Sequence, residues 1–212
     1  MKDMPVFATE NGVASLTLRE IPYTARAYIH IRSSLEPVFL LNECVDFCRA
    51  VGAQEIFAAG DGVVESYPFH TTVLCMTCRK EALGDTEAAL WPVQDDTISQ
   101  WKEIYNQKAV KVPNAAWMTD ADCREMLRSG NGYFVHRDGC LLGIGRASGD
   151  EIRWVAACVP GAGADVVRAL AHTITADTVT LEVASANKKA MRLYADLGFL
   201  PAAELSRWHR IQ

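Results

Sequence analysis

The stretch Thr180–Phe199 reads TLEVASANKKAMRLYADLGF. Its first residues alternate between apolar and polar, which is typical of a strand, and the part that follows Asn187 has helical spacing. Asn187, Ala190 and Tyr194 are three or four positions apart, so they share one face of the predicted helix. Gly198 is placed to end that helix in a left-handed cap. The stretch therefore predicts a strand, a short loop and a capped helix.

This arrangement resembles the C-terminal signature of the GNAT family of acetyl-CoA-dependent N-acetyltransferases. In that pattern a strand ending in L-x-V precedes an Asn and then A-x-x-x-Y-x-x-x-G-F, and Asn187, Ala190, Tyr194, Gly198 and Phe199 all fall in register. The resemblance implies an enzyme that moves an acetyl group from acetyl-CoA to an amine of a small molecule or peptide by direct attack. The alternative is a catalytically inactive GNAT-fold module that binds a ligand or partner.

The resemblance also implies roles for two side chains on this helix. The family tyrosine lies near the thioester sulfur, so Tyr194 is the candidate general acid for the leaving thiolate. A phenol and a thiol have similar pKa values, which suits that transfer. The alternative is a structural role, in which the ring of Tyr194 is buried and its hydroxyl only makes a hydrogen bond. Asn187 would lie beside the pantetheine arm, or would only cap its own helix.

A second family landmark is the loop that holds the pyrophosphate through backbone N–H groups at a helix N-terminus. The corresponding segment here is Cys158-Val159-Pro160-Gly161-Ala162-Gly163-Ala164. Backbone from the strand before the loop is implied to pair with the pantetheine amides. The resemblance thus assigns acetyl-CoA contacts to Ala156, Ala157, Cys158, Gly161, Ala162, Gly163, Ala164 and Asn187.

The chain departs from the family pattern at this loop. The loop is shorter than usual, and Cys158 stands where the family has Gln or Arg. Asp165 falls in the first helical turn, where its charge would repel an anion. These departures favour the binding-module alternative. For the general base, Glu151 and Glu182 are both candidates, and neither is preferred.

The rest of the second half predicts the fold. Three strands separated by turn residues lie within 133–159, and a helix over 161–173 follows. A final strand is predicted over 205–211. The pattern predicts an α/β protein of the α+β type, with a mixed, mostly antiparallel central sheet and helices on both faces. By resemblance this is the GNAT-like acyl-CoA N-acyltransferase fold.

The first half repeats part of that order, with strands around a helix that begins at Pro37. We therefore predict a tandem arrangement, with a degenerate GNAT-like half at 1–90 and the acetyltransferase domain at 91–212. The polar segment Glu81–Asp96 is interpreted as the connection between them. The buried stripe of the first helix is predicted to consist of Phe39, Leu40, Cys44, Phe47 and Cys48.

Composition excludes several classes of protein. The 212 residues are 50% hydrophobic and 22% charged, which is ordinary for a folded chain with a core. The formal net charge of −5 is not the basic footprint of a nucleic-acid binder. No run of about 20 apolar residues and no secretory signal is visible, so we expect a cytoplasmic protein without membrane contact. A homodimer is compatible with these features.

The seven cysteines are an odd number, and we expect them to be reduced thiols. Cys75 and Cys78 have CxxC spacing, and Cys44 and Cys48 are one helical turn apart. Four such thiols could form a zinc or redox site. Because Cys75 lies in a predicted strand rather than in a turn, we predict no metal.

Overall fold

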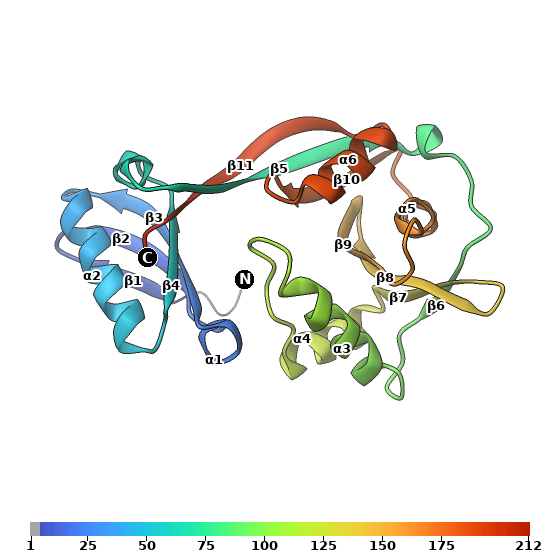
Figure 1. The fold of residues 1–212 in the computed structure, drawn as a ribbon, viewed down its shortest axis with the longest axis horizontal. Coiled ribbons are helices and arrows are strands. Elements are labelled where there is room, and N and C mark those ends of the chain that lie inside the picture. Colours follow the sequence, from blue (N-terminus) through green and yellow to red (C-terminus); the bar gives the residue numbers. More distant parts are fainter. Residues whose placement is uncertain (1–4) are drawn as a thin grey trace. The chain divides into compact units, whose positions relative to one another are not determined.

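The computed structural model describes residues 5–212, and the chain forms two compact units (Figure 1). One unit contains the residues up to Val73 together with Leu205–Gln212, and the other contains Leu74–Glu204. This division differs from the predicted 1–90 and 91–212. The physical reason is the last strand, in which His209 pairs with Ala58 and so returns the C-terminus to the first unit.

The first unit is a sheet with one long helix packed against it. Its elements are β1 (Val6–Thr9), β2 (Gly12–Thr17), α1 (Ile21–Thr24), β3 (Arg26–Ser34), α2 (Pro37–Ala50), β4 (Glu55–Ala59) and the 3₁₀ turn η1 (Gly62–Ser66). The long strands β5 (Phe69–Arg79) and β11 (Leu200–Arg210) contribute residues to both units. The strand order here is β1-β2-β3-β4-β11-β5, with β3 and β4 parallel.

The helix α2 begins at Pro37 as predicted, but its buried face is partly different. The buried side chains are Leu40, Leu41, Cys44, Val45 and Cys48. The prediction was wrong for Phe39 and Phe47, which are 62% and 40% exposed. At about 100° per residue, Phe39 lies almost opposite the centre of the buried stripe and Phe47 lies at its edge. The ring of Phe47 packs instead against Phe7, with centroids 5.4 Å apart.

The second unit holds the other elements. They are η2 (Lys80–Leu83), β6 (Ala89–Pro92), α3 (Ile98–Ala109), α4 (Asp120–Ser129), β7 (Gly132–Arg137), β8 (Cys140–Ser148), β9 (Glu151–Ala157), α5 (Gly163–Ala171), β10 (Thr178–Ala184) and α6 (Lys188–Asp196). The strand order is β11-β5-β10-β9-β8-β7-β6, and β9 and β10 are parallel. Three consecutive antiparallel strands, β7 to β9, are confirmed.

The predicted connection Glu81–Asp96 was only partly right, because it contains the edge strand β6. Residues Ala89–Pro92 pair antiparallel with β7, from Ala89↔His136 to Pro92↔Tyr133. Proline lacks an N–H group, and an edge strand tolerates it. Trp91 and Pro92 can therefore end a strand inside the predicted connection.

Helices cover both faces of the second unit's sheet, so the predicted fold class is confirmed. Buried residues of α5 and α6 form one cluster, and those of α3 and α4 form another. Two glycines of β8 let α5 approach closely. A Cβ at Gly143 would lie 2.7 Å from Val166, and one at Gly145 would lie 2.2 Å from Leu170. The position of α5 over β8 therefore depends on these glycines.

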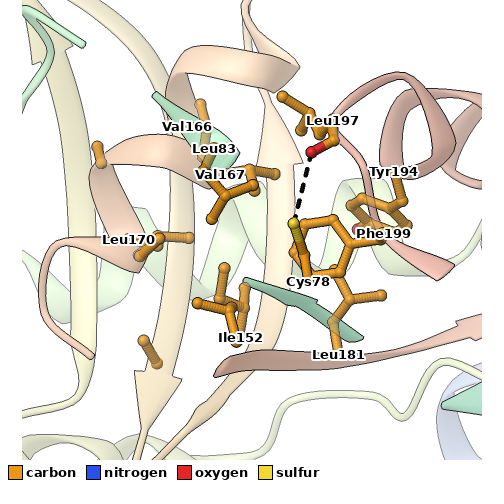
Figure 2. Packing of buried hydrophobic residues seen from close by; sticks show 14 of the residues in the cluster. Cys78, Leu83, Ile152, Val166, Val167, Leu170, Leu181, Tyr194, Leu197 and Phe199 are labelled. Atoms are coloured by element: carbon orange, nitrogen blue, oxygen red, sulfur yellow. Dashed lines mark hydrogen bonds between the residues drawn. The ribbon is translucent and has the colours of Figure 1, made fainter. Parts of the chain in front are cut away.

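Two helices of the second unit have defined caps, and the left-handed cap predicted at Gly198 is confirmed. Thr119 and Asp122 form a capping box at the start of α4. The residue after α6 and Leu197 is Gly198, whose φ of 89° is in the left-handed region. The chain then turns inward, and Phe199 is buried beside Tyr194 (Figure 2). In residues 5–212, no helix has the length and apolar character needed to cross a membrane.

Candidate functional site

The strands β9 and β10 are paired only where they begin. Their parallel ladder consists of Thr180↔Glu151 and Leu181↔Ile152. Both strands continue, to Ala157 and Ala184, but no further pair between them occurs in the described part of the chain. The two strands therefore diverge toward their carboxyl ends, and one edge of β9 loses its neighbour there.

The alternation of the ladder decides which main-chain groups face this gap. The N–H of Cys158 donates to the carbonyl of Leu142, at 2.8 Å, so the Cys158 amide faces β8. In an antiparallel pair successive residues point to opposite sides. The main-chain groups of Ala156 also face β8, and those of Val155 and Ala157 face the gap. Of the predicted strand contacts, Ala157 lies toward the gap, while the amides of Ala156 and Cys158 lie toward the ladder.

The loop after β9 leads directly into α5. Gly161 has a φ of 83°, which favours glycine, and a Cβ there would meet nothing within 4 Å. Ala162 is buried, and its N–H donates to Val159 O at 3.3 Å, so that amide is already used. The N–H groups of Gly163, Ala164 and Asp165 donate to no acceptor in residues 5–212. This helix start can therefore offer three free donors to an anion.

The charge of Asp165 is compensated by two arginines. Asp165 Oδ2 accepts a hydrogen bond from Arg137 at 2.9 Å, and Arg168 lies 3.7 Å from Oδ1. The hydroxyl of Thr86 donates to the same carboxylate at 3.2 Å. The expected repulsion of an anion by Asp165 is thus reduced, because the two guanidinium groups leave this cluster with a net positive charge. The sequence offered no signal for it, since Arg137 is far away along the chain.

The start of α5 also packs closely against α6. A Cβ at Gly163 would lie 2.8 Å from Cδ2 of Leu193. Gly163 therefore serves helix packing, which is a role that the sequence motif did not reveal. Asn187 precedes α6, and its Oδ1 accepts a hydrogen bond from the N–H of Ala190 at 3.2 Å. The capping alternative for Asn187 is confirmed, and its contact with pantetheine remains a prediction.

Tyr194 is 8% exposed and belongs to the apolar cluster beneath α5 and α6 (Figure 2). Its ring lies against Phe199, with centroids 5.8 Å apart. Burial raises the pKa of Tyr194 to about 12. Its hydroxyl has no hydrogen-bond partner among residues 5–212, and it is not among the polar atoms sealed from solvent. The alternative of a hydroxyl satisfied within the core therefore does not describe this tyrosine.

The two candidate bases differ in their surroundings. Glu151 forms an ion pair with Arg153 at 3.3 Å. Glu182 lies on β10 just beyond the last pair with β9. Although Glu182 is exposed, partial desolvation of its carboxyl raises its pKa, the neighbouring charge of Glu151 raises it further, and Arg153 opposes this. A carboxyl whose pKa is raised is a better proton acceptor near neutral pH.

The thiols lie in different surroundings. Cys44 and Cys48 are buried in the first unit, and burial raises their pKa values to about 12 and about 11. Cys78 is buried in the second unit, and its Sγ lies 3.6 Å from Leu197 O (Figure 2). Within residues 5–212, no group of three or more His, Cys, Asp and Glu is arranged to hold a metal ion.

The sequence matches no family model and no curated protein. The structure is similar to a conserved protein of unknown function from Staphylococcus epidermidis, with a TM-score of 0.65 at 12% identity over 99% of this chain and 94% of that one. It is also similar to a GCN5-related N-acetyltransferase from Sphaerobacter thermophilus, with a TM-score of 0.56 at 12% identity over 93% and 75%. A tandem GNAT protein of the clavulanic acid biosynthesis pathway gives 0.55 at 14% identity over 94% and 78%.

These likenesses establish the fold. The chain has the GNAT acetyltransferase fold, as the signature around Tyr194 predicted, and its neighbours include a tandem GNAT protein. The unpaired end of β9, at Ala157, is followed by the start of α5 at Gly163.

Proposed function

We propose that this chain is an N-acetyltransferase that transfers the acetyl group of acetyl-CoA to an amine of a small molecule or peptide. The observation that carries the proposal is the early end of the β9–β10 ladder at Leu181↔Ile152. A closed ladder would use the main-chain groups of Val155 and Ala157. Because β10 no longer pairs with β9 at these residues, their main-chain groups remain available to an extended ligand that pairs like a strand.

The residues present fit acetyl-CoA at both ends of its extended arm. The N–H and carbonyl of Val155 and the carbonyl of Ala157 are available to the pantetheine amides, and the N–H of Ala157 is available to the thioester carbonyl. The free N–H groups of Gly163, Ala164 and Asp165 offer a seat for the pyrophosphate. The guanidinium groups that compensate Asp165 keep this seat from being negative.

Acetyl-CoA supplies an acetyl group activated as a thioester, and the protein residues position it and move protons. Glu182 accepts the proton that the amine must lose before its nitrogen can attack the carbonyl carbon. The N–H of Ala157 stabilises charge that develops on the carbonyl oxygen. Tyr194, which stays protonated because its pKa is raised to about 12, donates a proton to the departing thiolate. The C–N bond forms as the C–S bond breaks, without an acyl-enzyme intermediate.

The test has a binding step and a chemical step. Calorimetry with acetyl-CoA should give saturable binding with one site per chain. Release of CoA in the presence of a panel of primary amines should then be measured by chromatography, since seven cysteines would interfere with thiol reagents. Absence of binding at millimolar acetyl-CoA would overturn the proposal.

The second candidate is a GNAT-fold module that binds a ligand without catalysis. The short passage from Ala157 at the end of β9 to Gly163 at the start of α5 favours it. In this case acetyl-CoA binds, but no amine in the panel accelerates CoA release. If Tyr194→Phe leaves turnover on an accepted amine unchanged, Tyr194 is not the general acid, and the transferase proposal itself still stands.

A further inference from the structure

A pocket in the Leu74–Glu204 unit is lined by residues other than those of the gap beside β9. Its volume is about 810 Å³, and its walls come from the end of β5, η2, the last turn of α5 and the start of β10. We call it the β5–α5 pocket. Its size is within the usual range for sites that bind small molecules, about 300–1,000 Å³.

Two half-buried cations lie in the inner part of this pocket, beside the buried side chain of Leu83. Lys80 Nζ donates to the carbonyl of Ile174, and Arg168 Nε donates to the carbonyl of Leu83 at 2.7 Å. Each bond uses only part of what the side chain can donate, because an ammonium has three N–H groups and a guanidinium has five. The nearest carboxylate to Arg168 is that of Asp165, at 3.7 Å, which is too long for a hydrogen bond.

Lys80 has no carboxylate within ion-pair distance in the part of the chain that the structure describes. A half-buried ammonium without a counter-charge costs free energy, and an anion brought into the pocket would offset that cost. The terminal nitrogens of Arg168 can add a planar pair of donors suited to a carboxylate or phosphate group. The inner part of the pocket is therefore a seat for a compact oxyanion.

The outer part of the pocket has the opposite character. The exposed carboxylates that line it are those of Glu81, Asp85 and Asp177. Glu81 forms an ion pair with the exposed Arg79, at 3.4 Å. The carboxylates of Asp85 and Asp177 then leave the rim with more negative than positive charge. Carboxylates at the rim oppose a ligand with several negative charges, and they attract a ligand that carries a cation beyond its anionic group.

We propose that the β5–α5 pocket binds a small zwitterion, whose carboxylate or phosphate group contacts Lys80 and Arg168 and whose cationic group faces the rim carboxylates. The pocket lies at the C-terminal end of α5, while Gly163 and the gap beside β9 lie at its other end. The two sites have different linings, and Arg168, which also lies 3.7 Å from Asp165, is the residue that they share. The proposal does not depend on acetyltransferase activity.

The test uses the full chain labelled with ¹⁵N and follows its amide resonances at constant ionic strength. The probes are L-alanine, phosphoethanolamine and acetate. We expect saturable shifts at residues 80–85 and 168–178 with at least one zwitterion, and about tenfold weaker binding of acetate. The stronger of the two zwitterions distinguishes a carboxylate ligand from a phosphate ligand. Absence of shifts with all three probes would mean that Lys80 and Arg168 serve only as ties to backbone carbonyls, and would overturn the proposal.

Matched variants separate the two ends of the pocket. Lys80→Gln and Arg168→Gln should each weaken binding of the better zwitterion about tenfold, because a charge-assisted hydrogen bond is lost. The double variant Asp85→Asn, Asp177→Asn should weaken binding of the zwitterion and leave binding of acetate unchanged. Both positions are exposed, so the protein should tolerate these substitutions. Arg124→Gln, an exposed position on α4, is the control and should change neither. Equal shifts in all variants would contradict the site. No arm contains acetyl-CoA, so failure of the acetyltransferase proposal would leave this result readable.

Discussion

Leu181 of β10 pairs with Ile152 of β9, and this is the last pair of their parallel ladder in the described chain. The next main-chain groups of β9 that point the same way belong to Val155 and Ala157. A strand edge that is left open inside a sheet is a template for an extended ligand. The first prediction follows from this edge.

Replacing Ala157 by proline removes the N–H that faces the gap and leaves the ladder to β8 intact. We expect the affinity for acetyl-CoA to fall about fivefold, which corresponds to one lost hydrogen bond of about 1 kcal/mol. Calorimetry measures this change. Ala157→Ser keeps the N–H and is the control, with affinity close to that of the parent. If the proline variant is folded and binds equally well, the Ala157 N–H does not contact acetyl-CoA and the gap is not its binding site.

The second prediction concerns the charge at the start of α5. Asp165→Asn should increase the affinity for acetyl-CoA about two- to fivefold, because a negative charge near the pyrophosphate seat is removed. Arg137→Gln should decrease it, because the Asp165 carboxylate then loses its 2.9 Å partner. Both effects should shrink at high salt. Changes of the same sign in the two variants would show that this electrostatic explanation is incorrect.

The third prediction is the pH dependence of stability that Tyr194 causes. The pKa of Tyr194 is about 12 in the folded chain, against about 10 in the unfolded chain. Between these values the folded chain keeps a proton that the unfolded chain releases. The stabilisation is therefore complete below pH 10 and is lost as pH rises through 12.

A shift of two pKa units amounts to about 2–3 kcal/mol for this buried group. Urea unfolding at pH 9 and pH 11 should show a smaller loss of stability for Tyr194→Phe than for the parent chain. The difference between the two chains matters, because other groups titrate in the same range. An identical loss in both chains would mean that Tyr194 is not shielded from solvent as the structure places it.

The fourth prediction tests the close approach of α5 to the sheet. A Cβ at Gly143 would lie 2.7 Å from Cγ2 of Val166 on α5, and 2.5 Å from the carbonyl oxygen of Ala156 on β9, which is main chain and cannot turn aside. Gly143→Ala should lower the free energy of unfolding by about 1–3 kcal/mol. Gly62→Ala is the control, since a Cβ there meets nothing within 4 Å. Thermal melting should show a clear loss for the first variant and little change for the second.

The fifth prediction is local to α4. The Thr119 side chain accepts a hydrogen bond from the N–H of Asp122 at 3.4 Å, and the Asp122 carboxylate accepts one from the N–H of Thr119 at 2.9 Å. Thr119→Ala should cost about 1 kcal/mol of stability, and Thr119→Ser should retain most of it. Urea unfolding compares the three chains. Equal losses for serine and alanine would rule out the capping contribution.

The sequence by itself determined the features that depend on neighbours along the chain. The left-handed end at Gly198 and the capping alternative for Asn187 were predicted from the spacing around one helix, because caps depend on residues within a few positions of each other. The signature that includes Tyr194 was sufficient to predict the fold, because it resembles that of the GNAT family.

Only the tertiary structure decided the features that join distant segments. The point where the β9–β10 ladder ends depends on how the sheet twists and packs, and the sequence near Ile152 does not predict it. The compensation of Asp165 requires Arg137 from another strand. The pocket that contains Lys80 and Arg168 likewise joins segments far apart in the chain. Such contacts follow from packing rather than periodicity, and charge and cavity are properties of the folded surface.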